Sequence, residues 1–540
     1  MALIGVRMTN SYLTLESVSY VLADGRVLFS GLDARFDGQP TAIVGRNGVG
    51  KSVLARILAG QLSPSEGHCR RGGKVHYLAQ RIDPHASIAT LLGVQGLLAA
   101  LERIEGGGLD PVDYDLIGER WDIRQQLQVE LERHALKGLD ISRPAASLSG
   151  GEAMRVALAG ACLSDAQMLI LDEPSNHLDR PARQFLMEQL RRWPRGLIVV
   201  SHDRELLEQM SRIVELSSLG LRGYGGGYAF YAQQKAVERD EALRQLEHAR
   251  LERKRAEQVI RRQQERQEQR QARAERQAGQ ANQAPILLGR RKGISEQTRG
   301  KQQAQHAAVR EGLAQQVREA ARAVEQEVAV VLQAPVSSQV ARRRVLVLDE
   351  LRLPRVPGSL SLVLHGQQRV GVVGRNGSGK STLLKVLAGQ LAPVGGDFAV
   401  KGTLAYLDQE SSGIDPQRSI LELLRVANRQ ASEGTLRTRL AQLGLGSECV
   451  LQPSGLLSGG ERLKGALACV LHADEPPQVL LLDEPSNHLD LVSLQALENM
   501  LLQFQGTLLV VSHDQRFLDQ LKLTERLQAS VDGWQLQPWA

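Results

Sequence analysis

A long internal repeat constrains the fold of this chain more than any other feature of its sequence. The loop pattern G-x-x-x-x-G-K-S occurs at Gly45–Ser52 and again at Gly374–Ser381. After each loop the same three motifs follow in the same order: Leu-Ser-Gly-Gly-Glu, Asp-Glu-Pro-Ser-Asn-His-Leu-Asp and Val-Val-Ser-His-Asp. Because 540 residues are too many for one hydrophobic core, the repeat predicts two domains with the same α/β fold.

Each glycine-rich loop lies between a strand-like apolar run and a helical run, which is the context of a phosphate-binding loop. The apolar runs are 41–44 and 370–373. Glycines let successive backbone N–H groups point at phosphates, and the start of the following helix adds partial positive charge. Lys51 and Lys380 would then neutralise the transferred phosphate, while Ser52 and Ser381 would hold Mg²⁺.

Two further motifs predict catalytic groups at the ends of buried strands. The runs 168–172 and 480–483 are apolar and end in Asp172 and Asp483, which we expect in the Mg²⁺ shell. The adjacent Glu173 and Glu484 are placed to polarise an attacking water. His202 and His513 also follow apolar runs, so each could reach the terminal phosphate.

The Leu-Ser-Gly-Gly-Glu motif precedes a helical run in both halves, so each half has a second helix start that could meet phosphate. Ser149, Gly150 and Gly151 begin this helix in the first half; Ser458, Gly459 and Gly460 begin it in the second. One domain has little use for two phosphate-facing helix ends, which suggests a site shared between the halves.

The segment between the repeats is rich in Gln, Arg, Glu and Ala and predicts two helices, about 233–277 and 296–333. Residues 232–330 hold 21 Lys and Arg against 14 Asp and Glu, whereas the remainder of the chain is almost neutral. Two interpretations remain: a solvated helical face, or a surface that binds a polyanion such as nucleic acid. For the second, we expect Arg290, Arg291 and Lys292 to bind RNA near the hairpin tip, with the apolar triplet Ile286–Leu288 beside them.

These patterns divide the chain into residues 1–231, a linker at 232–335 and residues 336–540. An insertion in the first half, about 81–147, is either a short protruding arm or a variable helical subdomain. The four cysteines form no C-x-x-C pair, which argues against disulfides and against zinc or iron–sulfur sites. No run of eighteen apolar residues occurs and the first eleven residues do not resemble a signal peptide, so we expect a cytoplasmic protein.

The ordered motifs, together with Gln80 and Gln409, resemble the ATP-binding-cassette ATPases. The resemblance implies two such P-loop NTPase domains in tandem, joined by a helical hairpin, in a monomer whose cassettes pair head to tail. Each ATP would lie between the loop of one cassette and the signature of the other, with Mg²⁺ also near Gln80 or Gln409. The residues implied to bind ATP are Tyr20, Gly45, Asn47, Gly48, Gly50, Lys51, Ser52, Val53, Gln80, Ser149, Gly150, Gly151, Gly374, Asn376, Gly377, Gly379, Lys380, Ser381, Thr382, Gln409, Ser458, Gly459 and Gly460.

Two cassettes on one chain with a charged linker closely resemble the ABC-F subfamily, whose members act on ribosomes. This resemblance implies binding to rRNA and to the tRNA in the peptidyl site, near the exit site for tRNA, and either control of translation or resistance to an antibiotic. No membrane subunit is then expected. The alternatives are a DNA-associated ATPase of the same fold and the soluble motor of a transporter.

The sequence departs from the family pattern at two places. The aromatic residue that stacks on adenine is matched by Tyr20 in the first half, but Leu353 stands at the aligned position of the second, so nucleotide affinity is expected to differ between the sites. Val53 replaces the Thr that commonly follows the loop Ser, which leaves the expected Mg²⁺ ligand Ser52 intact.

Overall fold

The computed structural model of the chain describes residues 12–79, 83, 85–280, 304–321, 344–408, 413–487, 489–530 and 533–539. The chain divides into two compact units. One contains both halves of the repeat, residues Met1–Tyr231 and Val330–Ala540, and the other is Ala232–Ala329. Among the described residues, no helix has the length and apolar character needed to cross a membrane.

The first half is built on a six-stranded sheet in the order β5-β6-β7-β3-β8-β9, in which only β9 is antiparallel to its neighbour. A second, antiparallel sheet has the order β2-β1-β4. The strands are β1 Leu13–Val21, β2 Val27–Phe36, β3 Thr41–Gly45, β4 Glu66–Arg71, β5 Val75–Leu78, β6 Met168–Asp172, β7 Gly196–Val200, β8 Arg212–Ser217 and β9 Gly220–Gly225. The helices are α1 Lys51–Ala59, α2 Ile88–Leu91, α3 Gln95–Glu105, α4 Pro111–Ile117, α5 Ile123–Arg133, α6 Gly150–Leu163, α7 Arg180–Arg191 and α8 Arg204–Glu208, with a 3-10 turn at Ala145–Ser147.

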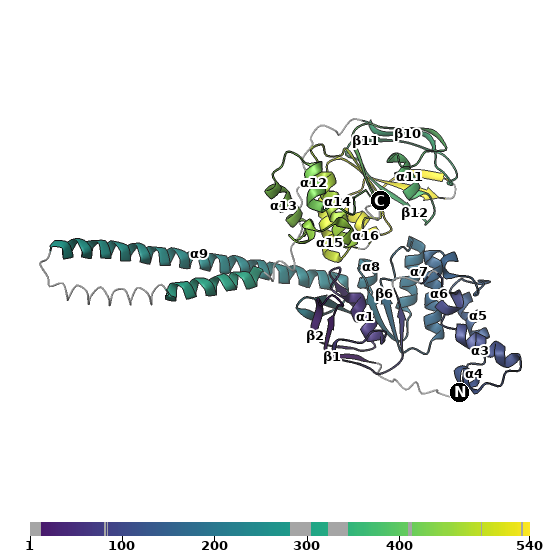
Figure 1. The fold of residues 1–540 in the computed structure, drawn as a ribbon. Coiled ribbons are helices and arrows are strands. Elements are labelled where there is room, and N and C mark those ends of the chain that lie inside the picture. Colours follow the sequence, from purple (N-terminus) through teal and green to yellow (C-terminus); the bar gives the residue numbers. More distant parts are fainter. Residues whose placement is uncertain are drawn as a thin grey trace. The chain divides into compact units, whose positions relative to one another are not determined.

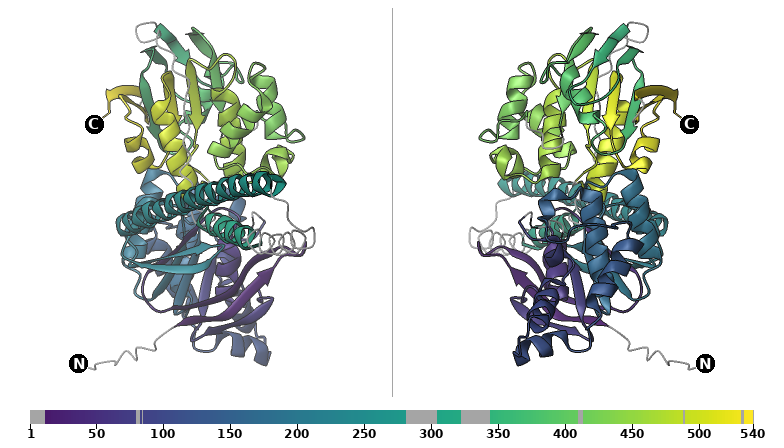
Figure 2. Two further views of the ribbon diagram at one scale, coloured as in Figure 1. Left: turned by 90° about the vertical axis from the view of Figure 1, so that its left-hand side faces the viewer. Right: turned by 90° about the vertical axis from the view of Figure 1, so that its right-hand side faces the viewer.

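Alternate residues of the central strands pack on opposite faces of the large sheet. On β6, Met168 and Ile170 join the apolar cluster that contains α1, whereas Leu169 and Leu171 join the cluster that contains α6 and α7. Helices therefore cover both faces (Figures 1 and 2). A sheet buried on both sides requires continuous apolar strands, which is why these segments could be read from the sequence.

The insertion of the first half forms a helical subdomain, which decides between the two interpretations left open by the sequence. Helices α3, α4 and α5 pack on α6 around a cluster of their own that includes Leu97, Ile117, Leu127 and Val156. Arg103 ties α3 to α4 through the buried Asp113 at 2.9 Å.

The second half repeats this architecture. Its large sheet has the order β14-β15-β16-β12-β17-β18 and its small sheet the order β11-β10-β13. The strands are β10 Arg344–Arg352, β11 Leu360–His365, β12 Arg369–Gly374, β13 Gly395–Val400, β14 Leu404–Leu407, β15 Val479–Asp483, β16 Thr507–Val511, β17 Glu525–Ser530 and β18 Gly533–Pro538. The helices are α11 Lys380–Leu387, α12 Ile420–Ala427, α13 Glu433–Gln442, α14 Gly459–Leu471, α15 Leu491–Gln503 and α16 Gln515–Gln520, with 3-10 turns at Cys449–Leu451 and Ser454–Leu456.

The linker is helical in its described part. Helix α9 covers Tyr228–Gln280, a few residues longer at each end than the sequence predicted, and a second helix covers residues 304–321. The expected tip residues, Arg290–Lys292 and Ile286–Leu288, lie outside the described residues.

Candidate functional site: two nucleotide sites

Both glycine-rich loops turn from a parallel strand into a helix. In the first, β3 ends at Gly45 and α1 begins at Lys51; in the second, β12 ends at Gly374 and α11 begins at Lys380. Gly50 has φ +106° and a Cβ there would lie 2.6 Å from Leu28 Cδ2, so both backbone and space require glycine. Gly379 has φ +93°, and a Cβ would lie 2.4 Å from Val356 Cγ2.

The loop lysines are held inside their own loops. Lys51 Nζ donates to Gly45 O at 2.9 Å and to Arg46 O at 3.0 Å, and Lys380 repeats the pattern with Gly374 O and Arg375 O at 2.9 Å each. Burial lowers the pKa of both ammonium groups, and nearby carboxylates oppose this. Each lysine thus presents a buried cation inside its own glycine-rich loop, which suits a phosphate.

Parallel strands deliver the acidic residues to the same edge of the sheet as the loop. Ser381 Oγ donates to Asp483 Oδ1 at 3.0 Å. In the first half, burial raises the pKa of Asp172 and the neighbouring Ser52 hydroxyl opposes this shift. Two tyrosines that the sequence did not single out, Tyr77 of β5 and Tyr406 of β14, donate to these aspartates at 3.1 and 3.4 Å. In the sequence, only their position three residues before the predicted glutamines Gln80 and Gln409 could have identified them.

The predicted catalytic pairs lie together in both halves. His202 Nε2 is 3.5 Å from Glu173 Oε1, and His513 Nε2 is 3.5 Å from Glu484 Oε1. Both glutamates have φ +49°, a conformation that a non-glycine residue adopts only when its surroundings impose it. Because each glutamate directly follows the last residue of a buried strand, the sharp turn aims its carboxylate at the imidazole rather than along the chain.

The electrostatics of these pairs favour general-base chemistry. Burial raises the pKa of Glu173 to about 8 and that of Glu484 to about 7, although the loop lysine of each site opposes the shift. Burial and the neighbouring lysine lower the pKa of His202 to about 3 and that of His513 to about 4, so both rings are neutral near pH 7. A carboxylate with a pKa close to the working pH can accept a proton from water efficiently.

A pH profile should reveal these carboxylates. Because an acid with a raised pKa becomes ionised only as the pH rises through that value, we expect kcat/KM for ATP to climb between about pH 6 and about pH 8.5 and then level off. Steady-state ATPase assays at saturating Mg²⁺ test this, since kcat/KM reports the free enzyme. A profile that is flat over this range would contradict the assignment of either glutamate as the base.

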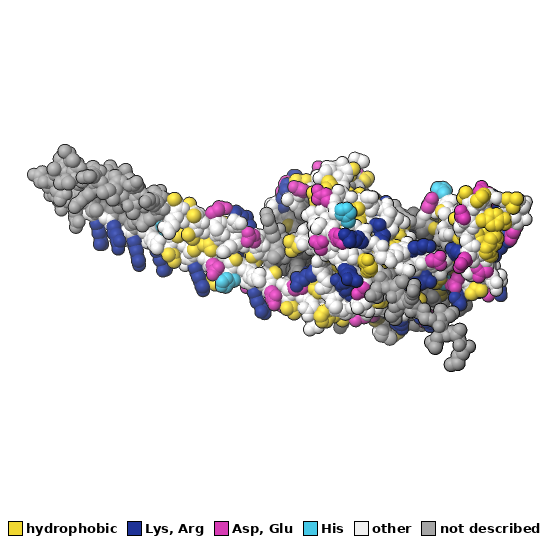
Figure 3. Space-filling view, turned by 90° about the horizontal axis from the view of Figure 1, so that it is seen from below, with side chains coloured by type: hydrophobic (Ala, Val, Ile, Leu, Met, Phe, Trp, Pro, Cys, Tyr) yellow, Lys and Arg dark blue, Asp and Glu magenta, His cyan; other side chains and the backbone are white. Residues whose placement is uncertain are grey.

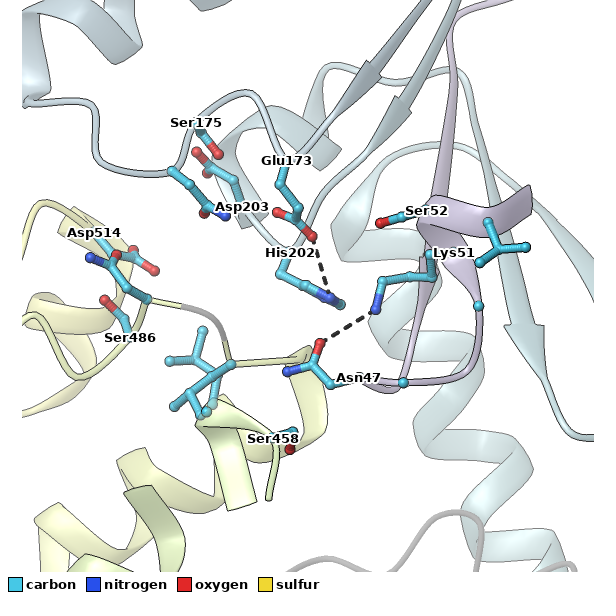
Figure 4. A pocket seen from close by; sticks show the side chains of 18 of the residues that line it. Asn47, Lys51, Ser52, Glu173, Ser175, His202, Asp203, Ser458, Ser486 and Asp514 are labelled. Carbon is cyan, nitrogen blue, oxygen red and sulfur yellow. Dashed lines mark hydrogen bonds and ion pairs between the residues drawn. The ribbon is translucent and has the colours of Figure 1, made fainter. Parts of the chain in front are cut away.

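A cavity of about 620 Å³ joins groups from the two halves. Its wall contains the first loop with Lys51 and Ser52, the pair Glu173 and His202, and, from the second half, Ser458 and Gly459 of the signature (Figure 4). Further lining residues come from both halves: Asn47, Gly48, Gly50, Val53, Ser175, Asn176, Asp203, Ser486, Asn487 and Asp514. The size suits a nucleotide, and the helix start at Ser458 adds a second group of phosphate donors to the cavity wall.

Each glycine-rich loop also contacts the end of the Asp-Glu-Pro-Ser-Asn-His-Leu-Asp motif of the other half. The backbone N–H of Asn47 donates to Asp490 Oδ2 at 2.9 Å. In the reciprocal position, the backbone N–H of Asn376 donates to Asp179 Oδ2 at 3.3 Å, and its side chain donates to His177 O at 3.0 Å. His513 Nε2 lies 2.9 Å from Asn376 Oδ1, so loop, histidine and the opposite half are connected.

Most of the remaining predicted residues lie at helix starts. Ser149 and Ser458 cap α6 and α14, and each forms a capping box with the glutamate three residues on. Gly150, Gly151 and Gly460 lie in the first turns of these helices, and Thr382 follows Ser381 in α11. Gly377 has φ +78° at the tip of the second loop. Gln80 and Gln409 lie outside the described residues.

Tyr20, expected to stack on the base, is not among the residues that line the cavity, and its role there stays a prediction. Its ring lies beside Phe29, 6.3 Å between centroids, and the cavity wall includes Leu22, Arg26 and Leu28 from the segment that follows it. Leu353, its counterpart, is 4% exposed within the core of the second half. The sequence did not single out Arg26, a cation in the turn between β1 and β2 that lines the cavity.

The chain is similar to known ATP-binding proteins. The ABC transporter family model matches residues 35–176 and 358–487. The chain is 31% identical to the tylosin resistance ATP-binding protein TlrC of Streptomyces fradiae, over 94% of this chain and 95% of TlrC. It is 30% identical to the energy-dependent translational throttle protein EttA of Mycobacterium tuberculosis (94% and 89%), and 31% identical to the probable ATP-binding protein YheS of Escherichia coli K12 (91% and 75%).

Solved structures show the same tandem fold. The archaeal ribosome recycling factor aABCE1, in its complex with the stalk protein aP1, aligns with a TM-score of 0.52 at 20% identity, over 95% of this chain and 87% of that one. Two matched cassettes and relatives that align along almost the whole chain leave one assignment: this protein is an ATP-hydrolysing member of the ABC-F subfamily of ATP-binding-cassette ATPases.

Proposed function

We propose that this ATPase binds the ribosome near the exit site for tRNA in its ATP-bound state and acts on translation through its linker. EttA is named as a translational throttle and TlrC as a tylosin resistance protein, and both are similar to this chain along nearly their whole length. These names support either control of translation or protection against a ribosome-targeting antibiotic. In either case the protein would work in the cytoplasm, with rRNA and peptidyl-site tRNA as its partners.

The observation that carries the proposal is a stripe of arginines on α9. Arg255, Arg262, Arg266, Arg270 and Arg273 are all exposed, and spacings of seven, four, four and three residues place them on one face of the helix. Figure 3 shows Lys and Arg side chains in a row along the linker. None of the ion pairs among the described residues uses these five arginines, so their charge is available to phosphates.

We further propose that each ATP is bound with Mg²⁺. Asp172 Oδ1 is buried and has no hydrogen-bond partner among the described residues, and Ser52 lies beside it. Ser381 and Asp483 repeat this pair in the second half. Carboxylate and hydroxyl oxygens suit Mg²⁺, so these residues would hold the ion, which would supply positive charge against the phosphates; Gln80 and Gln409 are further candidate ligands.

Sedimentation through a sucrose gradient tests the proposed target. A variant that binds ATP but cannot hydrolyse it should migrate with ribosomes from a cell extract when ATP is present and should return to the top after treatment with RNase. Migration that is abolished by DNase instead would support the alternative, a DNA-associated ATPase. Failure to migrate with either would count against both.

Removing the arginine stripe should weaken ribosome binding in a salt-dependent way. With all five arginines changed to Gln, which keeps helix propensity, the slope of log K against log salt should fall by roughly 0.7 to 0.9 for each phosphate that the helix no longer neutralises. Binding measured at several salt concentrations gives the slope. We expect the same direction of change for the triple variant Arg290→Ala, Arg291→Ala and Lys292→Ala.

A matched control is available on the same helix. Arg253 and Arg261 already pair with Glu257 at 3.5 Å and Glu265 at 3.1 Å, so changing these two to Gln should alter the slope much less per residue. An unchanged slope in the stripe variant would refute an RNA-binding role for this face.

A further inference from the structure

The segments that carry the two catalytic histidines meet at one arginine, Arg183 of α7. Its guanidinium pairs with Asp203 Oδ2, next to His202, and its Nη1 donates to the backbone oxygen of His513 at 2.8 Å. Arg183 belongs to the first half and His513 to the second. A single planar cation therefore holds both histidine segments, one through a side chain and the other through the backbone.

The guanidinium of Arg183 and the carboxylate it pairs with are both buried. Arg183 and Asp203 are each 8% exposed. Burial raises the pKa of Asp514, which follows His513; the nearby Asp203 raises it further, and Arg183 opposes the change. Two carboxylates, one from each half, thus depend on the same guanidinium, and without it they would repel each other in a region with little water.

The bridge occurs once, although the motifs around it occur twice. Counted from Asp179 and Asp490, which begin α7 and α15 in the same way, the position of Arg183 is occupied by Leu494 in the second half. Leu494 is 2% exposed and belongs to the apolar core. The two sites are therefore related by the repeat, but the arginine that contacts both histidine segments in the described part of the chain comes from the first half.

A second ion pair also takes its cation from the first half and contacts the second half. Arg204, in the first half, donates to both carboxylate oxygens of Glu498 in the second, at 2.7 and 3.2 Å. The corresponding positions are Gln515 and Met187, which cannot form this pair. Arg204 anchors the helix that begins directly after Asp203, so it steadies the same segment that Arg183 holds.

We propose that Arg183 is a positioning residue that couples the two nucleotide sites, so that ATP bound at one raises the affinity of the other. When a bound ATP phosphate moves one histidine segment toward its glutamate, the planar guanidinium of Arg183, which is bonded to both segments, also restricts the position of the other. The proposal rests on ATP binding by both cassettes and not on the ribosome, so it is tested on the isolated protein.

Calorimetric titration of ATP into the non-hydrolysing Glu173→Gln/Glu484→Gln protein measures the coupling. With Arg183 present, the second ATP should bind more tightly than two independent sites allow, by a factor in the usual range of about 5 to 150. Arg183→Met should bring this factor close to 1. Arg191→Met, an exposed change on the same helix, should leave it unaltered. A parent protein without coupling, or an Arg183→Met variant that keeps it, would overturn the proposal.

A second variant separates coupling from mere charge balance. Arg183→Met/Asp514→Asn removes one of the two facing carboxylates, and Asn can still cap α16. We expect it to recover the melting temperature of the parent while the coupling factor stays near 1. If Asp514→Asn restores the coupling as well, the role of Arg183 is only to neutralise charge, and the positioning role is wrong. Because this variant relieves the repulsion, it also serves if Arg183→Met alone does not fold.

Discussion

The Glu173→Gln/Glu484→Gln protein should bind ATP normally and lose turnover by about 10²- to 10⁴-fold, the usual contribution of a positioned general base. The amide keeps the size of the side chain, while the Mg²⁺ candidates Asp172 and Asp483 and the loop lysines stay in place. Phosphate release measures turnover, and nucleotide binding to the same preparation shows that the sites remain intact. Such a protein should also be trapped on its target and inhibit growth when it is expressed.

Glu188→Gln is the control for this substitution, because Glu188 is exposed on α7 and is not among the residues that line the cavity. It should hydrolyse ATP at the parent rate. Near-normal hydrolysis by the double variant would remove Glu173 and Glu484 from the mechanism and leave their strained backbone and raised pKa values without a role.

Ser458→Arg should disable the site that contains Lys51, although the two residues lie in different halves of the chain. Ser458 lines the same cavity as Lys51 and caps α14, so a bulky cation there would block the helix start from phosphate and occupy the space of the nucleotide. In the Glu484→Gln background, where only the Lys51 site can turn over, we expect a loss of about 10²-fold, comparable to removing one donor to a developing charge.

Folding must be checked in parallel, because loss of the cap alone costs about 1 kcal/mol. Ser458→Asn, which retains a capping side chain, should melt at the parent temperature, and the melting temperature of Ser458→Arg should fall only slightly. Full activity of Ser458→Arg in the Glu484→Gln background would show that the signature of the second half does not serve the Lys51 site.

The sequence alone determined the local elements and most of the chemistry. Residues that share one motif, such as Gly45 to Ser52 or Asp172 with Glu173, are fixed relative to one another by the few bonds between them, and the short apolar runs before them predict buried strands. Because parallel strands end at one edge, even the meeting of Glu173 with His202 follows from pattern and spacing.

The tertiary structure decided what no spacing can encode. The insertion forms a helical subdomain because its apolar residues pack on α6, and the ring of Tyr20 lies beside Phe29. Arg183 carried no signal in its motif, since an arginine on an amphipathic helix is usually a solvated side chain. Its significance arises only when two segments more than three hundred residues apart bring Asp203 and the backbone oxygen of His513 to the same guanidinium, where burial makes the charge indispensable.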